Sequence, residues 1–227
     1  MHQGDQDGIK GLYHINAADC VTQWEVVATV GKISEAYLLP VIEQMLAQFP
    51  FKLHGFHADN DREFVNRPVA KLLNKLLIEF TRSRPRHSND NGLAETKNGA
   101  VVRNMFGFSH IPQRHATRFN AFYSEHLNPF LNFHRPCLFS IDRPDPKKPG
   151  RFKRIYRPQD AMTPLDKLAS LPDAALFLCE GIALADLHVK ARVLTDLQAA
   201  KKLNAALLVL FRPVTARSTA ATIARAA

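Results

Sequence analysis

Two carboxylates in distinctive surroundings are the strongest candidates for chemistry in this chain. Asp59 ends the run 52–59, which is typical of a strand that delivers a carboxylate at its C-terminal tip. Glu95 follows the polar loop 83–92, at the start of an expected helix, with 35 residues between the two carboxylates. Carboxylates that meet at one point can hold Mg²⁺, which prefers oxygen ligands. Two such ions about 3.5–4 Å apart can clamp the attacking and leaving oxygens of a phosphodiester.

The segments around these carboxylates resemble the second and third catalytic blocks of the DDE integrases and transposases. Segment 57–64 reads His-Ala-Asp-Asn-Asp-Arg-Glu-Phe, and segment 83–98 reads Ser-Arg-Pro-Arg-His-Ser-Asn-Asp-Asn-Gly-Leu-Ala-Glu-Thr-Lys-Asn. The spacing between Asp59 and Glu95 is also the signature of that family, which includes retroviral integrase and bacterial insertion-sequence transposases. The resemblance extends over residues 9–136, and the rest of the chain looks, less specifically, like the tail of some insertion-sequence transposases.

The resemblance implies a fold, a reaction and a partner. The fold would be α/β and ribonuclease H-like, with a central mixed sheet flanked by helices. The reaction would be DNA cleavage and strand transfer, in which a metal-activated hydroxyl, first from water and then from a DNA 3′ end, attacks a phosphodiester in line. Asp59 and Glu95 would hold Mg²⁺ or Mn²⁺ together with a third carboxylate. The protein would act as a homo-oligomer on transposon ends and target DNA, because two ends must be joined.

The third carboxylate of the family is an Asp on the first strand of the core, and here the sequence departs from the pattern. Residues 1–8 read as the turn after that strand, so the expected Asp falls about two residues before His2, ahead of this chain. Asp5 and Asp7 lie in a Gly-rich turn, and Asp19 follows the next strand, so none of the three is a good replacement. The first strand is therefore expected to be missing, and this chain alone is expected to be inactive.

Four basic residues near Glu95 are candidates for contact with DNA phosphates. Lys97 lies two residues after Glu95 and so points about 200° away around an α-helix. Arg103 lies farther along the same expected helix, while Arg84 and Arg86 lie in the preceding loop. Each of the four has the simpler interpretation of a solvated surface charge.

Composition favours a polyanionic partner without naming it. The 227-residue chain carries 30 Lys and Arg against 21 Asp and Glu, a formal net charge of +9. Basic residues that neutralise phosphates release counterions, which favours nucleic acid, although a merely basic housekeeping protein would look the same. The 46% hydrophobic content supports a sizeable core.

Cysteine usage and hydropathy indicate a cytoplasmic protein without membrane contact. Cys20, Cys137 and Cys179 show no CxxC spacing, and an odd count argues against a disulfide framework. The most apolar stretch, 174–186, contains Glu180 and is too short to span a bilayer.

Periodicity predicts three regions. Residues 1–136 would form the core, which the resemblance implies is integrase-like, with strands at 13–17, 24–30, 51–58 and 78–81 and helices at 34–48, 64–77, 93–105 and 116–127. Residues 137–160 would form a basic linker, because 141–158 holds seven Lys or Arg and several Pro. Residues 161–227 would form a helical C-terminal region, with helices at 164–170, 184–193 and 195–210.

Two other functions fit the same residues. A non-catalytic DNA-binding remnant of a transposase would keep the fold and the basic surface without the chemistry, and would bind DNA without any response to Mg²⁺ or Mn²⁺. A ribonuclease H-like nuclease of another kind would cut DNA without joining it. Metal-dependent strand transfer would single out the transposase.

Overall fold

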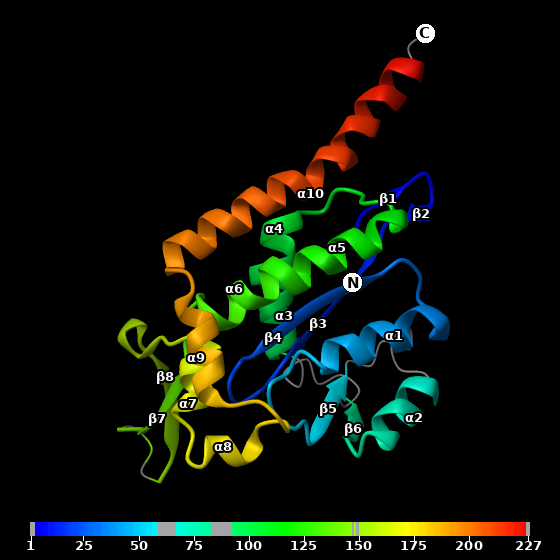
Figure 1. Cartoon of the computed structure of the whole chain (residues 1–227). Coiled ribbons are helices and arrows are strands. Elements are labelled where there is room, and N and C mark those ends of the chain that lie inside the picture. Colours follow the sequence, from blue (N-terminus) through cyan, green and yellow to red (C-terminus); the bar gives the residue numbers. More distant parts are fainter. Residues whose placement is uncertain (1–2, 59–66, 83–91, 147, 149, 226–227) are drawn as a thin grey trace.

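The computed structural model describes residues 3–58, 67–82, 92–146, 148 and 150–225, and it is a mixed α/β protein (Figure 1). The strands are β1 (Asp5–Gln6), β2 (Ile9–Lys10), β3 (Tyr13–Ala18), β4 (Glu25–Val30), β5 (Gly55–Ala58), β6 (Glu79–Arg82), β7 (Ser140–Pro144) and β8 (Phe152–Tyr156). The helices are α1 (Glu35–Leu46), α2 (Arg67–Lys75), α3 (Gly92–Lys97), α4 (Asn104–Phe106), α5 (Ala116–Phe122), α6 (Asn128–Phe133), α7 (Pro164–Ala169), α8 (Ala174–Phe177), α9 (Leu184–Arg192) and α10 (Asp196–Arg225). Two π-helical segments, Asn98–Arg103 and Tyr123–Leu127, join α3 to α4 and α5 to α6.

The strands pair two by two among the described residues, in place of the single mixed sheet expected. β1–β2, β3–β4 and β7–β8 are antiparallel, whereas β5 and β6 are parallel and connected through α2. The strand expected at 51–58 begins only at Gly55, because Phe51 forms an isolated bridge with Leu178 near the C-terminal helices.

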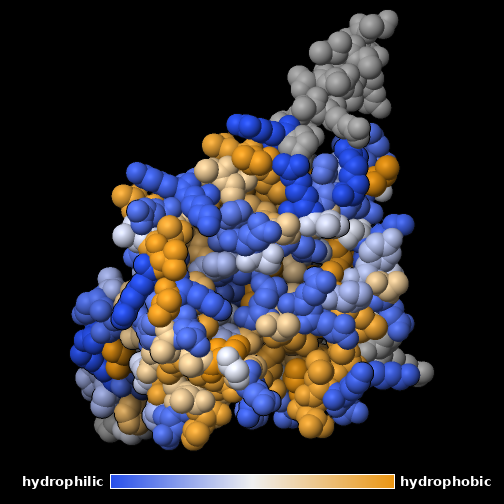
Figure 2. All heavy atoms as spheres, in the orientation of Figure 1, coloured by the Kyte–Doolittle hydropathy of each residue, from blue (hydrophilic) through white to orange (hydrophobic). Residues whose placement is uncertain are grey.

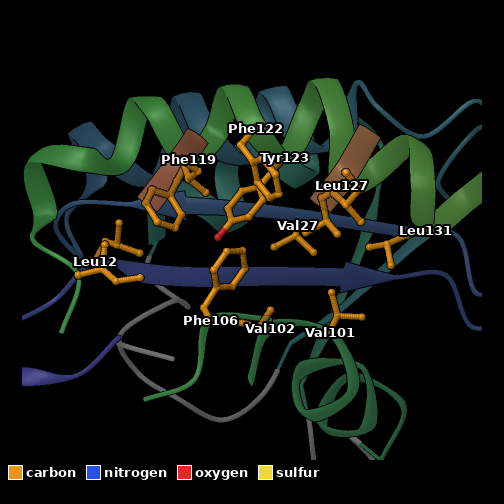
Figure 3. Close-up of a cluster of buried hydrophobic side chains, with 13 residues drawn as sticks. Leu12, Val27, Val101, Val102, Phe106, Phe119, Phe122, Tyr123, Leu127 and Leu131 are labelled. Atoms are coloured by element: carbon orange, nitrogen blue, oxygen red, sulfur yellow. The ribbon is translucent and has the colours of Figure 1, made fainter. Parts of the chain in front are cut away.

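Strand β4 is the centre of the fold, and all six of its residues are buried. Alternate side chains of a strand point to opposite faces. Val26 and Ala28 pack toward α1 and the segment that follows it, while Val27 joins the opposite cluster. In Figure 3 Val27 lies between Tyr123 and Leu127 on one side and side chains of the α3–α4 helix on the other. The β-branched residues suit a strand that is covered on both faces.

The outer edge of β4 is closed by three asparagine side chains instead of another strand. Asn132 Oδ1 accepts from Glu25 N–H at 2.7 Å and Asn132 Nδ2 donates to Glu25 C=O at 2.8 Å. Asn128 does the same to Val27 at 3.0 and 3.2 Å, and Asn120 to Thr29 at 2.7 and 2.8 Å. We call these three residues the asparagine ladder. Each amide presents one of its N–H donors and its carbonyl acceptor to the strand as a peptide group would, so it satisfies a buried backbone pair.

The α3–α4 helix is fixed to β3 through a buried histidine. His14 stacks on Phe106, with ring centroids 5.4 Å apart, and its Nδ1 lies 2.8 Å from the Tyr123 hydroxyl oxygen. Burial, with a smaller contribution from nearby positive charge that includes Arg103, lowers the pKa of the His14 imidazole to about 3. The imidazole is therefore neutral at neutral pH, as its aromatic surroundings require.

The C-terminal helices belong to the same hydrophobic clusters as the preceding residues. Leu203 and Leu210 of α10 are buried against α5 and α6, along which α10 runs in Figure 1. Leu165 and Leu187 of α7 and α9 pack in the cluster of Trp24. The helical region predicted after residue 161 thus covers the α/β part of the molecule.

The predicted basic linker contains a β-hairpin. β7 and β8 pair from Ser140↔Tyr156 to Pro144↔Phe152. The base of the hairpin is tied down, because Cys137 and Met162 exchange backbone hydrogen bonds of 2.9 and 3.2 Å. The segment is an ordered arm that projects from the α7 side of the molecule (Figure 1).

Removing one rung of the asparagine ladder should destabilise the protein. Asn128→Ala would leave the buried N–H and C=O of Val27 without partners, so we expect the free energy of unfolding to fall by about 3 kcal/mol. Urea unfolding followed by circular dichroism measures this. The control is Asn204→Ala, the same change at an exposed position of α10, which should alter stability by less than about 0.5 kcal/mol. Equal effects of the two variants would contradict the ladder's importance.

Stability should fall in mild acid because of His14. A histidine whose pKa is lowered by folding stabilises the protein fully above its unfolded pKa of about 6.5, and the contribution is lost as the pH falls toward 3. We expect a loss of about 2 kcal/mol between pH 7 and pH 5. His14→Gln should flatten this slope in urea titrations, while His54→Gln, at an exposed position, should preserve it. If the unfolding free energy of His14→Gln fell with pH as steeply as that of the unmodified protein, His14 would not be the cause of the acid sensitivity.

Candidate active site

In the parallel β5–α2–β6 unit, the two strands that precede the predicted catalytic segments end side by side. Ala58 and Arg82 are paired at the carboxyl ends of β5 and β6. Asp59 follows Ala58 directly, and the loop that leads to Glu95 follows Arg82. Ligands of α/β proteins commonly bind outside the carboxyl ends of parallel strands. The edge formed by Ala58 and Arg82 is therefore the candidate active-site edge, although Asp59 itself lies outside the described residues.

Glu95 lies in the first turn of α3 with its side chain exposed. The helix packs against β3, and no described residue forms an ion pair with the Glu95 carboxylate. An exposed carboxylate is a suitable oxygen ligand for Mg²⁺ or Mn²⁺. Groups of three or more potential metal ligands do not occur among the residues that the structure describes, so within that part of the chain Glu95 is the predicted metal ligand that can be located.

Lys97 faces the opposite way from Glu95, as the helical spacing predicted, and it is buried. Its Nζ lies 3.3 Å from Glu25 Oε2 and 3.2 Å from Cys137 Sγ. The contact with Oε2 is an ion pair without the alignment of a hydrogen bond. Lys97 is thus engaged inside the protein, and its contact with DNA, which stays a prediction, would require this ion pair to open.

The partner of Lys97 is an almost fully buried carboxylate. Glu25 is 1% exposed and its Oε1 accepts a 2.8 Å hydrogen bond from Asn16 Nδ2. Burial raises the pKa of the Glu25 carboxyl, while the Lys97 charge and the Asn16 hydrogen bond act in the opposite direction. Because Glu25 is on β4 and Lys97 on α3, the ion pair fixes the helix that carries Glu95 to the central strand.

The predicted phosphate-binding residues are distributed unevenly. Arg103 is half-buried, with its guanidinium 4.5 Å from the centre of the Phe108 ring, a cation–π contact. Arg84 and Arg86 lie outside the described residues. The DNA contacts of these three arginines stay predictions.

The Glu25–Lys97 pair was missed by reasoning from the sequence, although one signal for it existed. Glu25 begins the run Glu-Val-Val-Ala-Thr-Val, which is otherwise uncharged and β-branched. A charge at the head of such a buried strand requires a partner, since isolated buried charges are costly. The sequence did not indicate that the partner lies about 70 residues later.

Comparison with known proteins adds one relative and no family. No model of a known protein family matches the chain. The "Uncharacterized protein y4rM" of Sinorhizobium fredii is 30% identical over 116 residues, which is 51% of this chain and 33% of that protein. The match thus spans about a third of the relative's length. None of the helices in the described part of the chain has the length and apolar character needed to cross a bilayer.

Breaking the buried ion pair from one side should be strongly destabilising. Lys97→Met leaves the Glu25 carboxylate buried and unpaired, so we expect a loss of about 3–5 kcal/mol in the free energy of unfolding. The double variant Glu25→Gln/Lys97→Met removes both charges and keeps the acceptor for Asn16, so it should recover at least about 2 kcal/mol.

Urea unfolding at pH 7 measures these variants, with Lys201→Met on the exposed side of α10 as the matched control. The control should change stability by less than about 0.5 kcal/mol. A Lys97→Met variant as stable as the control would show that the ion pair does not hold α3 in place.

Proposed function

We propose that this chain is the catalytic-core region of a DDE-type integrase or transposase, which cleaves DNA and joins its ends with the help of Mg²⁺ or Mn²⁺. The observation that carries the proposal is the candidate active-site edge. Asp59 follows the end of β5, and the segment with Glu95 follows the paired end of β6. These two residues are also those that match the family's carboxylates at the family's spacing.

The strand arrangement supports a ribonuclease H-like fold for the core. The residues around α1 form one cluster in which Val30 of β4 and Phe56 and Phe80 of β5 and β6 take part. The asparagine ladder occupies one edge of the β3–β4 pair. On the opposite edge, the backbone groups of Asn16 and Ala18 form no hydrogen bond with any described residue. A further strand between β3 and β5 would join the four strands into one mixed sheet, as the resemblance implies.

In this proposal the carboxylates of the chain bind the metal ions and its arginines orient the DNA. Asp59 and Glu95 supply carboxylate oxygens to the metal ions. The bound ions would activate the attacking hydroxyl and stabilise the leaving oxygen. Arg84, Arg86 and Arg103 would orient the DNA backbone through its phosphates. The Glu25–Lys97 pair keeps α3 oriented, with Glu95 on the side away from β4.

The partners follow from the same proposal. The net charge of +9 supports DNA as the substrate, and the joining of two DNA ends would require a homo-oligomer. The three cysteines are all free, which fits a protein of the cytoplasm. Because the matched relative is about three times as long as the matching segment, these partners are proposed for the core that this chain represents.

The carboxylates can be tested by substitution in the full-length protein. Asp59→Asn and Glu95→Gln should each reduce Mn²⁺-dependent nicking and joining of plasmid DNA by about 100-fold or more, because each removes a metal ligand. DNA affinity, measured by fluorescence anisotropy in EDTA, should change by less than about twofold. Glu43→Gln, an exposed carboxylate on α1, is the matched control and should retain activity.

The alternative function is a non-catalytic DNA-binding remnant, which the basic composition favours equally. In that case DNA binding would occur without any effect of Mn²⁺, and neither nicking nor joining would be detected in the full-length protein. Activity that survives in Glu95→Gln would instead contradict the assignment of this carboxylate to the metal. Cleavage without joined products would point to a nuclease.

A further inference from the structure

The β7–β8 hairpin presents a stripe of two aromatic rings and an arginine to solvent. Phe152, Arg154 and Tyr156 alternate along β8 and therefore share one face of the hairpin. Phe152 is 70% exposed and Tyr156 57% exposed. The two rings are two residues apart on the strand, a distance of about 6.8 Å. Neither ring packs against another aromatic ring in the part of the chain that the structure describes.

The same segment concentrates the positive charge of the protein. Residues 141–158 contain seven Lys or Arg and two Asp, a net +5 out of the chain's +9. Arg157 is used internally, since it pairs with Asp160 at the base of the hairpin. In contrast, Arg143, Arg151, Lys153 and Arg154 are exposed and form no ion pair with any described residue. In Figure 2 the surface at the lower left, where Figure 1 places the hairpin, is mainly hydrophilic.

The hairpin is held firmly enough to present this stripe. At its base the backbone of Cys137 pairs with that of Met162, and Gln23 Nε2 donates to Leu138 C=O at 2.8 Å. Ile141 and Ile155, which are paired and partly buried, lie on the opposite face from the stripe. The rings are thus not needed to form the hairpin's apolar contacts, and they are available to a ligand.

We propose that this face of the hairpin binds a single-stranded segment of nucleic acid, with bases stacked on Phe152 and Tyr156 and phosphates held by the surrounding Arg and Lys side chains. The occupant follows from charge complementarity and from ring geometry. A strongly basic surface attracts a polyanion, and stacking on an exposed ring requires a base whose face is free, which a duplex does not offer. The site lies on its own element and does not depend on the proposed catalysis.

Binding without metal tests the proposal separately from catalysis. Fluorescence anisotropy in EDTA would compare labelled oligo(dT) of 12 nucleotides with a 12-base-pair duplex. Phe152→Leu/Tyr156→Leu removes the rings and keeps apolar side chains, so we expect oligo(dT) to bind at least about tenfold more weakly and the duplex to change by less than about twofold. The matched control is Tyr37→Leu/Phe177→Leu, which removes two rings that are 50% and 46% exposed elsewhere and should change neither affinity.

A second variant separates the contribution of the basic side chains to affinity from that of the aromatic rings. Arg154→Gln, on the same face as the rings, should weaken both ligands and reduce the slope of log affinity against log salt for oligo(dT) by about 0.7, which is the contribution of one phosphate contact on a single strand. Lys153→Gln, whose side chain belongs to the opposite face of the strand, is the matched control and should change the slope less. An unchanged slope in Arg154→Gln would overturn the proposal that the arginine of the stripe holds a phosphate.

Tyr156→Trp provides a second test in case Phe152→Leu/Tyr156→Leu prevents the hairpin from forming. It keeps a stacking ring, so affinity for oligo(dT) should stay within about twofold, and the new indole should be quenched when oligo(dT) binds, over a constant background from buried Trp24. Absence of quenching would overturn the proposal. So would a leucine variant that loses duplex and oligo(dT) affinity equally, or one that loses neither, because binding would then be electrostatic alone.

Discussion

The asparagine ladder is the interaction on which the rest of the structure depends. A strand that is buried on both faces and at one edge has backbone groups that water cannot reach, and leaving them unpaired would cost more than most side-chain contacts provide. Asn120, Asn128 and Asn132 satisfy those groups from a single helical segment. Because the amides fix both the position and the register of α5–α6 against β4, they also fix the surface on which α10 packs.

The Glu25–Lys97 pair uses the same strand to orient the other helix. Buried ion pairs contribute little net stability compared with apolar side chains of similar size, so this pair is better explained by geometry. Its charges can meet only when Lys97 points toward β4. Glu95, two residues earlier, must then point away from the sheet and remain exposed. In the proposed function, this orientation would keep the Glu95 carboxylate from pairing with a cation inside the protein, so that it stays available to a metal ion.

The elements with strong local patterns could be predicted, and contacts between distant residues could not. The valine-rich strand at 24–30 and the helix at 34–48 correspond closely to β4 and α1. The hairpin at 140–156 was taken for a linker because Pro144 and dense positive charge concealed the pairing of Ile141 with Ile155. Lys97 was treated as a surface cation because nothing near it in sequence indicates Glu25. Asp59 was chosen from its neighbours, and its place in a metal site stays a prediction.

The distribution of charge assigns the two parts of the proposed function, DNA binding and phosphodiester chemistry, to different segments of the chain. More than half of the net charge lies in residues 141–158, which form the hairpin and its flanks, and the remaining +4 is spread over 209 residues. Electrostatic attraction of a polyanion would therefore be strongest at the hairpin and weaker at the edge formed by Ala58 and Arg82. A protein built in this way could lose its chemistry and keep its affinity, which is why binding alone does not distinguish a transposase from its remnant.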